Sequence, residues 1–151
     1  CRQGKNSHLE AGKIIMSTYS ALDLSNYDNT VQTLGNLRTL ERARRWSTAV
    51  LKTLGVNLDR KTKKKLANAL PEELGNDLKR LFWLVHFRDK GMTQQEFQFE
   101  VSKRSGNSDW QFTRIPIQGV FHGVKELVDQ DTQQAVADSL APDVRDLWQQ
   151  A

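Results

Sequence analysis

Hydrophobic and polar positions alternate with a helical period along most of this chain. From Asn26 to Gly35 the apolar residues fall at steps of four and three, at Tyr27, Val31 and Leu34. Such steps place side chains on one face of a helix. The next stretch continues them through Leu37, Leu40, Ala43, Trp46, Val50 and Leu54, and Gly55 is predicted to close that helix. Because no stretch shows the period of two and the turn pairs of strands, the pattern predicts an all-α fold.

Residues that start and stop helices punctuate this pattern. Asp59 is predicted to cap a third helix, because its carboxylate can accept from the free amides of the first turn. Pro71 and Pro142 are each predicted to open a helix, where a missing N–H is tolerated. The run Thr93-Gln94-Gln95-Glu96 is a capping box that restarts the helical pattern after a linker. Ser105-Gly106-Asn107 predicts the next break.

One motif occurs twice. Asp59-x-x-Thr62-x-x-x-Leu66-Ala67-x-x-Leu70-Pro71 is echoed seventy residues later by Asp129-x-x-Thr132-x-x-x-Val136-Ala137-x-x-Leu140, with Pro142 following. The identities at this offset fall at predicted caps and core positions: Val50/Val120, Asp59/Asp129, Thr62/Thr132, Ala67/Ala137 and Leu70/Leu140. This favours duplication over chance agreement between amphipathic helices. The sequence predicts a compact bundle of about eight short helices in two pseudo-repeated halves.

The predicted domain organisation follows from these boundaries. Residues 1–15 lack a periodic apolar face and are predicted to be a disordered or non-native leader, with Met16 as a plausible true start. Residues 16–151 form the single domain, with repeat one at about 26–87, a linker at 88–92 and repeat two at about 93–149. The segment 81–87 is apolar nearly all round and is predicted to lie buried between the halves. The expected large core anchors are Trp46, Trp83, Trp110 and Trp148.

These motifs resemble a known family. The run from Trp46 to Trp83, with Leu66-Ala67-x-x-Leu70-Pro71, and the ending Leu140-Ala141-Pro142-x-x-x-x-Leu147-Trp148 resemble the bacterial domain of unknown function 2267. The resemblance covers about residues 26–149. It implies a compact all-helical bacterial domain of two related halves, and it brings no catalytic residue with it.

Composition excludes several classes of protein. A single Cys rules out an intramolecular disulfide and a Cys-based zinc site. No apolar run approaches the roughly 20 residues that cross a bilayer, and the N-terminal residues lack a signal's apolar core. We therefore expect no membrane span and a cytoplasmic location. The net charge of +4 is uneven, because residues 1–75 hold thirteen Lys/Arg against seven Asp/Glu, and residues 76–151 nine against eleven.

Basic residues in the first half form the clearest candidate site. We predict one basic face, next to Arg44, made of Arg38, Arg42, Arg45, Lys52, Arg60, Lys61, Lys63, Lys64 and Lys65. In the second half the positions matching residues 60, 61 and 63–65 are Gln130, Asp131, Gln133, Gln134 and Ala135, so the fold does not require lysines there. The face is either solvated or binds something acidic. An acidic protein, self-association with the acidic C-terminal half, a membrane surface and nucleic acid are the alternatives.

Other chemistry has weaker signals. The histidines His8, His86 and His122 are expected to be structural or surface residues, and the acidic clusters to serve helix N-termini. No nucleophile motif or phosphate loop is present, so the sequence predicts no catalytic constellation, no metal site and no cofactor. Gly119 and Gly123, after Pro116, predict close helix contact or a small-ligand cleft. The sequence thus favours a non-enzymatic protein-interaction or regulatory module, with a nucleic-acid-associated accessory protein and a small-ligand carrier as alternatives.

Overall fold

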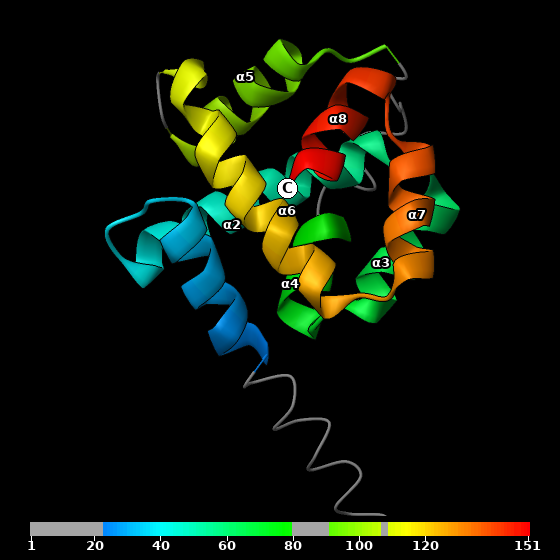
Figure 1. The fold of residues 1–151 in the computed structure, drawn as a ribbon, viewed down its shortest axis with the longest axis horizontal. Coiled ribbons are helices and arrows are strands. Elements are labelled where there is room, and N and C mark those ends of the chain that lie inside the picture. Colours follow the sequence, from blue (N-terminus) through cyan, green and yellow to red (C-terminus); the bar gives the residue numbers. More distant parts are fainter. Residues whose placement is uncertain (1–22, 80–90, 107–108) are drawn as a thin grey trace, which may run out of the picture.

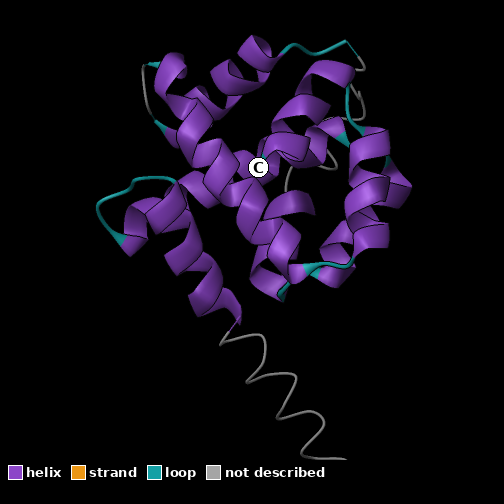
Figure 2. Ribbon diagram, viewed as in Figure 1, coloured by secondary structure: helices purple, strands orange, loops and turns teal. Residues whose placement is uncertain are grey.

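The chain folds as an assembly of helices. The computed structural model describes residues 23–79, 91–106 and 109–151. Within these ranges it has eight α-helices, one 3-10 helix and no strand (Figure 2), which confirms the all-α prediction. The first helix covers residues 23–34. The others are α2 (Leu40–Asn57), α3 (Arg60–Ala69), α4 (Glu72–Lys79), α5 (Gln94–Ser105), η1 (Trp110–Thr113), α6 (Arg114–Leu127), α7 (Gln130–Ser139) and α8 (Pro142–Gln150).

The predicted helix caps are confirmed. The Asp59 side chain accepts from the backbone N–H of Thr62 at 2.7 Å, and the Asp129 side chain accepts from that of Thr132 at 2.8 Å. Thr93 and Glu96 form the reciprocal capping box of α5. Gly106 ends α5 with φ of 79°, a left-handed conformation that suits glycine.

The helix bounds follow the predicted offset. The helix α3 runs over 60–69 and α7 over 130–139, seventy residues later at both ends. Helices α2 and α6 end at 57 and 127, and α4 and α8 begin at 72 and 142. This order is what a repeat would produce, and its origin by duplication stays an interpretation. The predicted buried segment 81–87, Trp83, most of the linker 88–92, His8, His86 and the leader 1–15 lie outside the described residues.

Helices from the two predicted halves cross one another (Figure 1). The long α2 packs on α4, α5 and α6, and the 23–34 helix lies beside α6. A Cβ at Gly119 would lie 2.9 Å from the Gly35 nitrogen, and one at Gly123 would lie 2.9 Å from the Tyr27 ring. The predicted close helix contact is therefore confirmed. Pro116 stands in the first turn of α6, where its missing N–H has no consequence.

The core is continuous and rich in aromatic residues. Phe121 of α6 packs between Phe97 and Trp148, with ring centroids 5.8 Å and 5.3 Å apart. Trp46 and Trp148 are buried, as predicted, whereas Trp110 is only half-buried. The row linking Phe97, Phe121 and Trp148 ties α5, α6 and α8 together.

Two predictions about the first helices are wrong. Gly55 does not close α2, which continues to Asn57. Glycine is required at position 55 because a side chain there would overlap the Leu78 carbonyl of α4. Its role is close packing rather than helix termination. Leu34 and Leu40 were expected on the inner face, yet 47% and 50% of their surfaces are exposed. They lie on either side of the loop at 35–39, where the core ends.

Candidate interaction surface

Three exposed arginines lie at and just before the start of α2. Thr39 caps the helix by accepting from the backbone N–H of Arg42 at 3.1 Å, so α2 begins within the basic sequence. Arg38, Arg42 and Arg45 follow at steps of four and three, and all three are exposed. None of them has an ion pair with any other residue in the described ranges. We call these three residues the arginine stripe.

Arg44, in the same run, has a structural role instead. Its guanidinium binds Asp28 through two hydrogen bonds, from Nη2 at 2.7 Å and from Nε at 3.2 Å. It also donates to Glu73 at 2.8 Å. The hydrogen bond to Asp28 is the main cause that raises the pKa of Arg44 further above its ordinary value. Arg44 thus links the 23–34 helix, α2 and α4, and its charge is already satisfied.

The remaining predicted cations do not extend the stripe. Lys52 is half-buried, and Lys63 is buried in α3, where loss of hydration lowers its pKa. The inclusion of Lys63 in an exposed basic face is therefore wrong. The burial of Lys63 could not be predicted from sequence spacing, because it depends on the packing of α3 against both α4 and α7.

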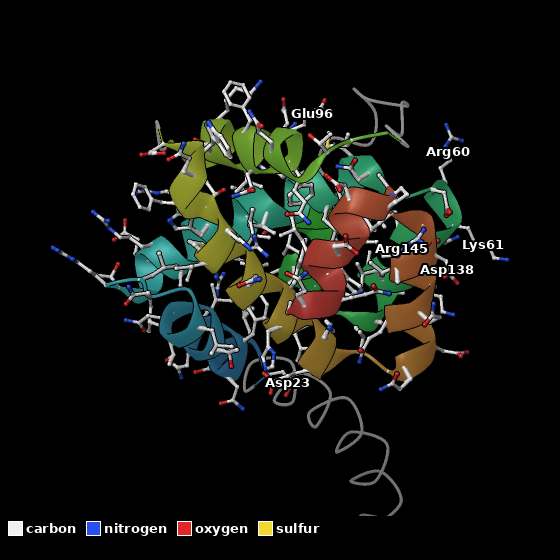
Figure 3. The ribbon with its side chains drawn as sticks, turned by 45° about the horizontal axis from the view of Figure 1, so that its top comes forward. Asp23, Arg60, Lys61, Glu96, Asp138 and Arg145 are labelled. Carbon is white, nitrogen blue, oxygen red and sulfur yellow. The ribbon has the colours of Figure 1, made fainter. Side chains whose placement is uncertain are left out.

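The exposed cations of α3 lie away from the stripe. Arg60 and Lys61 lie at one edge of the molecule, and Asp138 of α7 lies at the same edge (Figure 3). The start of α2 lies at the opposite edge in both Figure 1 and Figure 3. The predicted single basic face is thus two separate groups, and the α3 group consists of Arg60, Lys61, Lys64 and Lys65.

The α3 group lies beside carboxylates of its own chain. Helices α3 and α7 pack together, and Ser139 at the end of α7 bonds to Asp59 at the start of α3. The pKa of Asp129 is lowered chiefly by hydrogen bonds from Thr132, and the charge of Lys65 lowers it further. The basic α3 and the more acidic α7 are therefore neighbours, which offers an internal account of the charge asymmetry.

A cluster of exposed apolar side chains lies near the stripe. The 23–34 helix is joined to α2, since Tyr27 Oη bonds to Ser47 Oγ at 2.5 Å and Asp28 bonds to Arg44. Leu34 is the last residue of the first helix and Leu40 is the first residue of α2. These two residues therefore stand at the two ends of the loop at 35–39.

The 23–34 helix runs antiparallel to α6. A Cβ at Gly123 would meet Tyr27, one at Gly119 would meet Gly35 and the Val31 carbonyl, and one at Gly35 would lie 3.3 Å from the Cα of Pro116. Ile115, the residue before Pro116 in α6, is 52% exposed. Phe112 precedes it by one turn and is 70% exposed. We call Leu34, Leu40, Phe112 and Ile115 the apolar end cluster, because three helices end or begin there.

Other candidate sites have less to offer. His122 stands four residues before Glu126 on α6, with 3.8 Å between Nε2 and Oε2. No group of three His, Cys, Asp or Glu suited to a metal ion occurs within 23–79, 91–106 and 109–151. A hollow of 240 Å³ lies between the 23–34 helix and α6, and one of 540 Å³ lies along α5. Both are open to solvent.

Comparison with protein families identifies the class of this fold. The family model described as uncharacterized conserved protein (DUF2267) matches residues 27–147. The chain belongs to this family. No curated protein matches it. Among the helices that the structure describes, none is both long enough and apolar enough to span a bilayer.

Proposed function

We propose that this protein is a non-enzymatic interaction module that binds an acidic surface of a partner protein through the arginine stripe. The observation on which this rests is the contrast between Arg44 and its neighbours. Arg44 is held by Asp28 and Glu73, whereas Arg38, Arg42 and Arg45 extend into solvent without a partner in the described part of the chain. Arginines that make no stabilising ion pair within the fold are available to bind a partner.

The separation of the two basic groups argues against nucleic acid as the first choice. A duplex is bound through many phosphates, and affinity scales with the number of cations that reach them. The stripe supplies three, and the α3 group lies at the other edge, where Asp138 also lies. In the sequence from 38 to 45 no aromatic residue of the kind that stacks on bases is interleaved with the stripe, and Phe112 is the single exposed aromatic side chain of the apolar end cluster.

The small-ligand reading has a specific observation behind it, but a limited one. Gly123 lines the 240 Å³ hollow together with Tyr27 and Glu126. Pockets for small ligands are usually larger, at roughly 300 to 1,000 Å³, and mostly enclosed. The hollow along α5 is larger, but it is open to solvent and lined only by residues between 92 and 100. We therefore keep the carrier as the less favoured function.

Two triple variants with the same change of charge test the proposal. Arg38, Arg42 and Arg45 are replaced by Gln in one, and Lys61, Lys64 and Lys65 by Gln in the other. Binding to a labelled acidic helical peptide, a Lys-for-Glu version of it and a short DNA duplex is measured by fluorescence anisotropy at low and physiological salt. We expect the stripe variant to lose about tenfold or more in affinity for the acidic peptide and the α3 variant to lose little.

Two results contradict the proposal. Equal losses in both variants would mean that only net charge matters. Tighter binding of the duplex than of the acidic peptide, lost in either variant, would support the nucleic-acid reading instead.

A further inference from the structure

The exposed apolar side chains of this protein are not scattered. Among the described residues the large hydrophobic side chains with substantial exposure are Leu34, Leu40, Phe99, Phe112 and Ile115. Four of these five form the apolar end cluster. The fifth, Phe99, lies on α5, where the Lys103 ammonium covers its ring at 5.1 Å from the centroid. Single exposed apolar residues are ordinary on protein surfaces, whereas several of them at one end of a molecule indicate a contact site.

The cluster and the arginine stripe share one end of the molecule. Arg38 lies in the loop between Leu34 and Leu40, and Arg45 is five residues beyond Leu40 in α2. Five residues advance a helix by about 8 Å, which a guanidinium side chain can span. The one carboxylate within this segment of α2 is Glu41. The end is therefore apolar and, beside the apolar side chains, positively charged.

We propose that this end docks an amphipathic α-helix of a different protein, with its apolar face on the apolar end cluster and acidic residues against the arginine stripe. The inference rests on the proposed function and names the partner for it. A helix suits the surface because an extended peptide that binds by strand addition would need an exposed sheet edge, and the described residues contain no strand. Helix ridges, by contrast, pack on surfaces built from other helices.

A second copy of the chain is a poor occupant. A two-fold contact would bring one arginine stripe against the other, which like charge opposes. A head-to-tail contact would need an acidic and apolar face elsewhere. The exposed carboxylates of α7 and α8 are Asp131, Asp138, Asp143 and Asp146, and those helices have no large exposed hydrophobic residue. On α5 the exposed Phe99 lies under the Lys103 ammonium, and Glu100 is paired with Lys103 and Arg104, so this helix does not offer a free acidic and apolar face either. We therefore assign the complementary face to another molecule.

A membrane surface fits less well than a helix. Leu34, Leu40 and Ile115 are each about half buried against neighbouring helices, so only part of each side chain could enter lipid. Three cations near an anionic bilayer contribute roughly 1 kcal/mol each before screening. A lipid surface is nevertheless a distinct outcome that the test includes.

Two designed peptides of equal composition provide the probe. One places Leu at i, i+3, i+4 and i+7 on one helical face with Glu along both borders, and the other has the same residues in scrambled order. Vesicles containing phosphatidylserine are the third probe. The variants are Leu40→Ser with Ile115→Ser, and the matched control is Phe99→Ser, since Phe99 and Leu40 are equally exposed at 50%. All variants change exposed positions, and thermal melting confirms that they fold.

We expect the amphipathic peptide to bind about tenfold or more tightly than the scrambled one. The double serine variant should lose that advantage, and Phe99→Ser should keep it. Equal binding of both peptides, abolished by changing the stripe but not the cluster, overturns this inference and leaves the proposed function standing. Failure of both peptides to bind overturns both. If the protein binds the vesicles more tightly than the peptides and the double variant loses that binding, the helix proposal is overturned and the occupant of this end is a membrane surface.

Discussion

Ser139 joins the end of α7 to the start of α3. Its hydroxyl accepts a hydrogen bond from the backbone N–H of Asp59 at 2.9 Å and donates one to the Asp59 carboxylate at 3.1 Å. The residues are eighty positions apart in the chain. At the offset of seventy, the position that matches Ser139 is Ala69, which has no hydroxyl. The joint between the two capped helices is therefore made from one side only.

Replacing Ser139 with Ala should weaken the fold. The Asp59 amide would lose its acceptor while it remains partly buried, which costs about 1 to 3 kcal/mol in unfolding free energy. Chemical denaturation followed by circular dichroism measures the change. Asn68→Ala, an exposed change near the end of α3, is the control and should stay within about 0.5 kcal/mol of the parent. A Ser139→Ala protein as stable as its control would show that the joint contributes nothing.

Two glycines of α6 should differ in their tolerance of a methyl group. A Cβ at Gly119 meets the backbone of Gly35 and Val31, whereas one at Gly123 meets the Tyr27 ring. Backbone can yield only if the whole 23–34 helix shifts, so Gly119→Ala should cost about 1 to 3 kcal/mol despite the better helix propensity of Ala. Gly123→Ala should cost less. The reverse order in melting temperature would contradict the close contact at Gly119.

Arg44 and Arg45 should separate stability from binding. Arg44→Gln removes the ion pairs to Asp28 and Glu73, and we expect a loss of about 1 kcal/mol in unfolding free energy with binding of the acidic peptide retained. Arg45→Gln should leave stability within about 0.5 kcal/mol and weaken that binding. Denaturation and anisotropy on the same preparations check both. If Arg44→Gln weakened binding as much as Arg45→Gln, the assignment of a structural role to Arg44 would be wrong.

Acid should reveal the cap of α7. Hydrogen bonds from Thr132 hold the pKa of Asp129 below its ordinary 3.8, so folding favours its carboxylate form. The stability that this group contributes is present above its ordinary pKa and is lost as pH falls through the lower folded-state value. Asp129→Asn should therefore show a smaller loss of stability than the parent as the pH falls from about 5 to 2. Asp146→Asn, which changes an exposed carboxylate within α8 that caps no helix, is the control for net charge.

The sequence contained most of the fold in its caps and its apolar period. Asp59, Thr93, Gly106 and Pro142 act where they were expected, because each acts through its own or nearby backbone groups. The helical steps of Val120 and Val124 were likewise enough to place them in the core. Such local rules need no knowledge of the partner helix.

Errors arose where tertiary contacts decide. Gly55 and a helix-ending glycine look alike in sequence, and only the approach of Leu78 distinguishes them. Lys63 falls among surface lysines, but its side of α3 is covered. Leu40 fits the apolar period of α2, but it is exposed because the neighbouring helix ends before it. Periodicity predicts which face is inward, but not how far along the helix another element covers it.

The candidate site was predicted in part. The arginine stripe lies within the predicted basic face, but the division of that face into two groups depends on where α3 packs. The apolar end cluster had no signal of its own, because Leu34 and Leu40 fit the core pattern and Phe112 and Ile115 are far from them in sequence. The three helix ends come together only in the folded chain.

The leading helices of the two predicted halves are exchanged in their packing, since the 23–34 helix lies on α6 and α5 lies on α2. Each half therefore needs helices of the other half to complete its hydrophobic core, and unfolding of either half would expose the core of the other. A thermal melt should accordingly be a single calorimetric event rather than two successive ones. Although the sequence looks like two modules in tandem, we expect the whole domain to unfold as one cooperative unit.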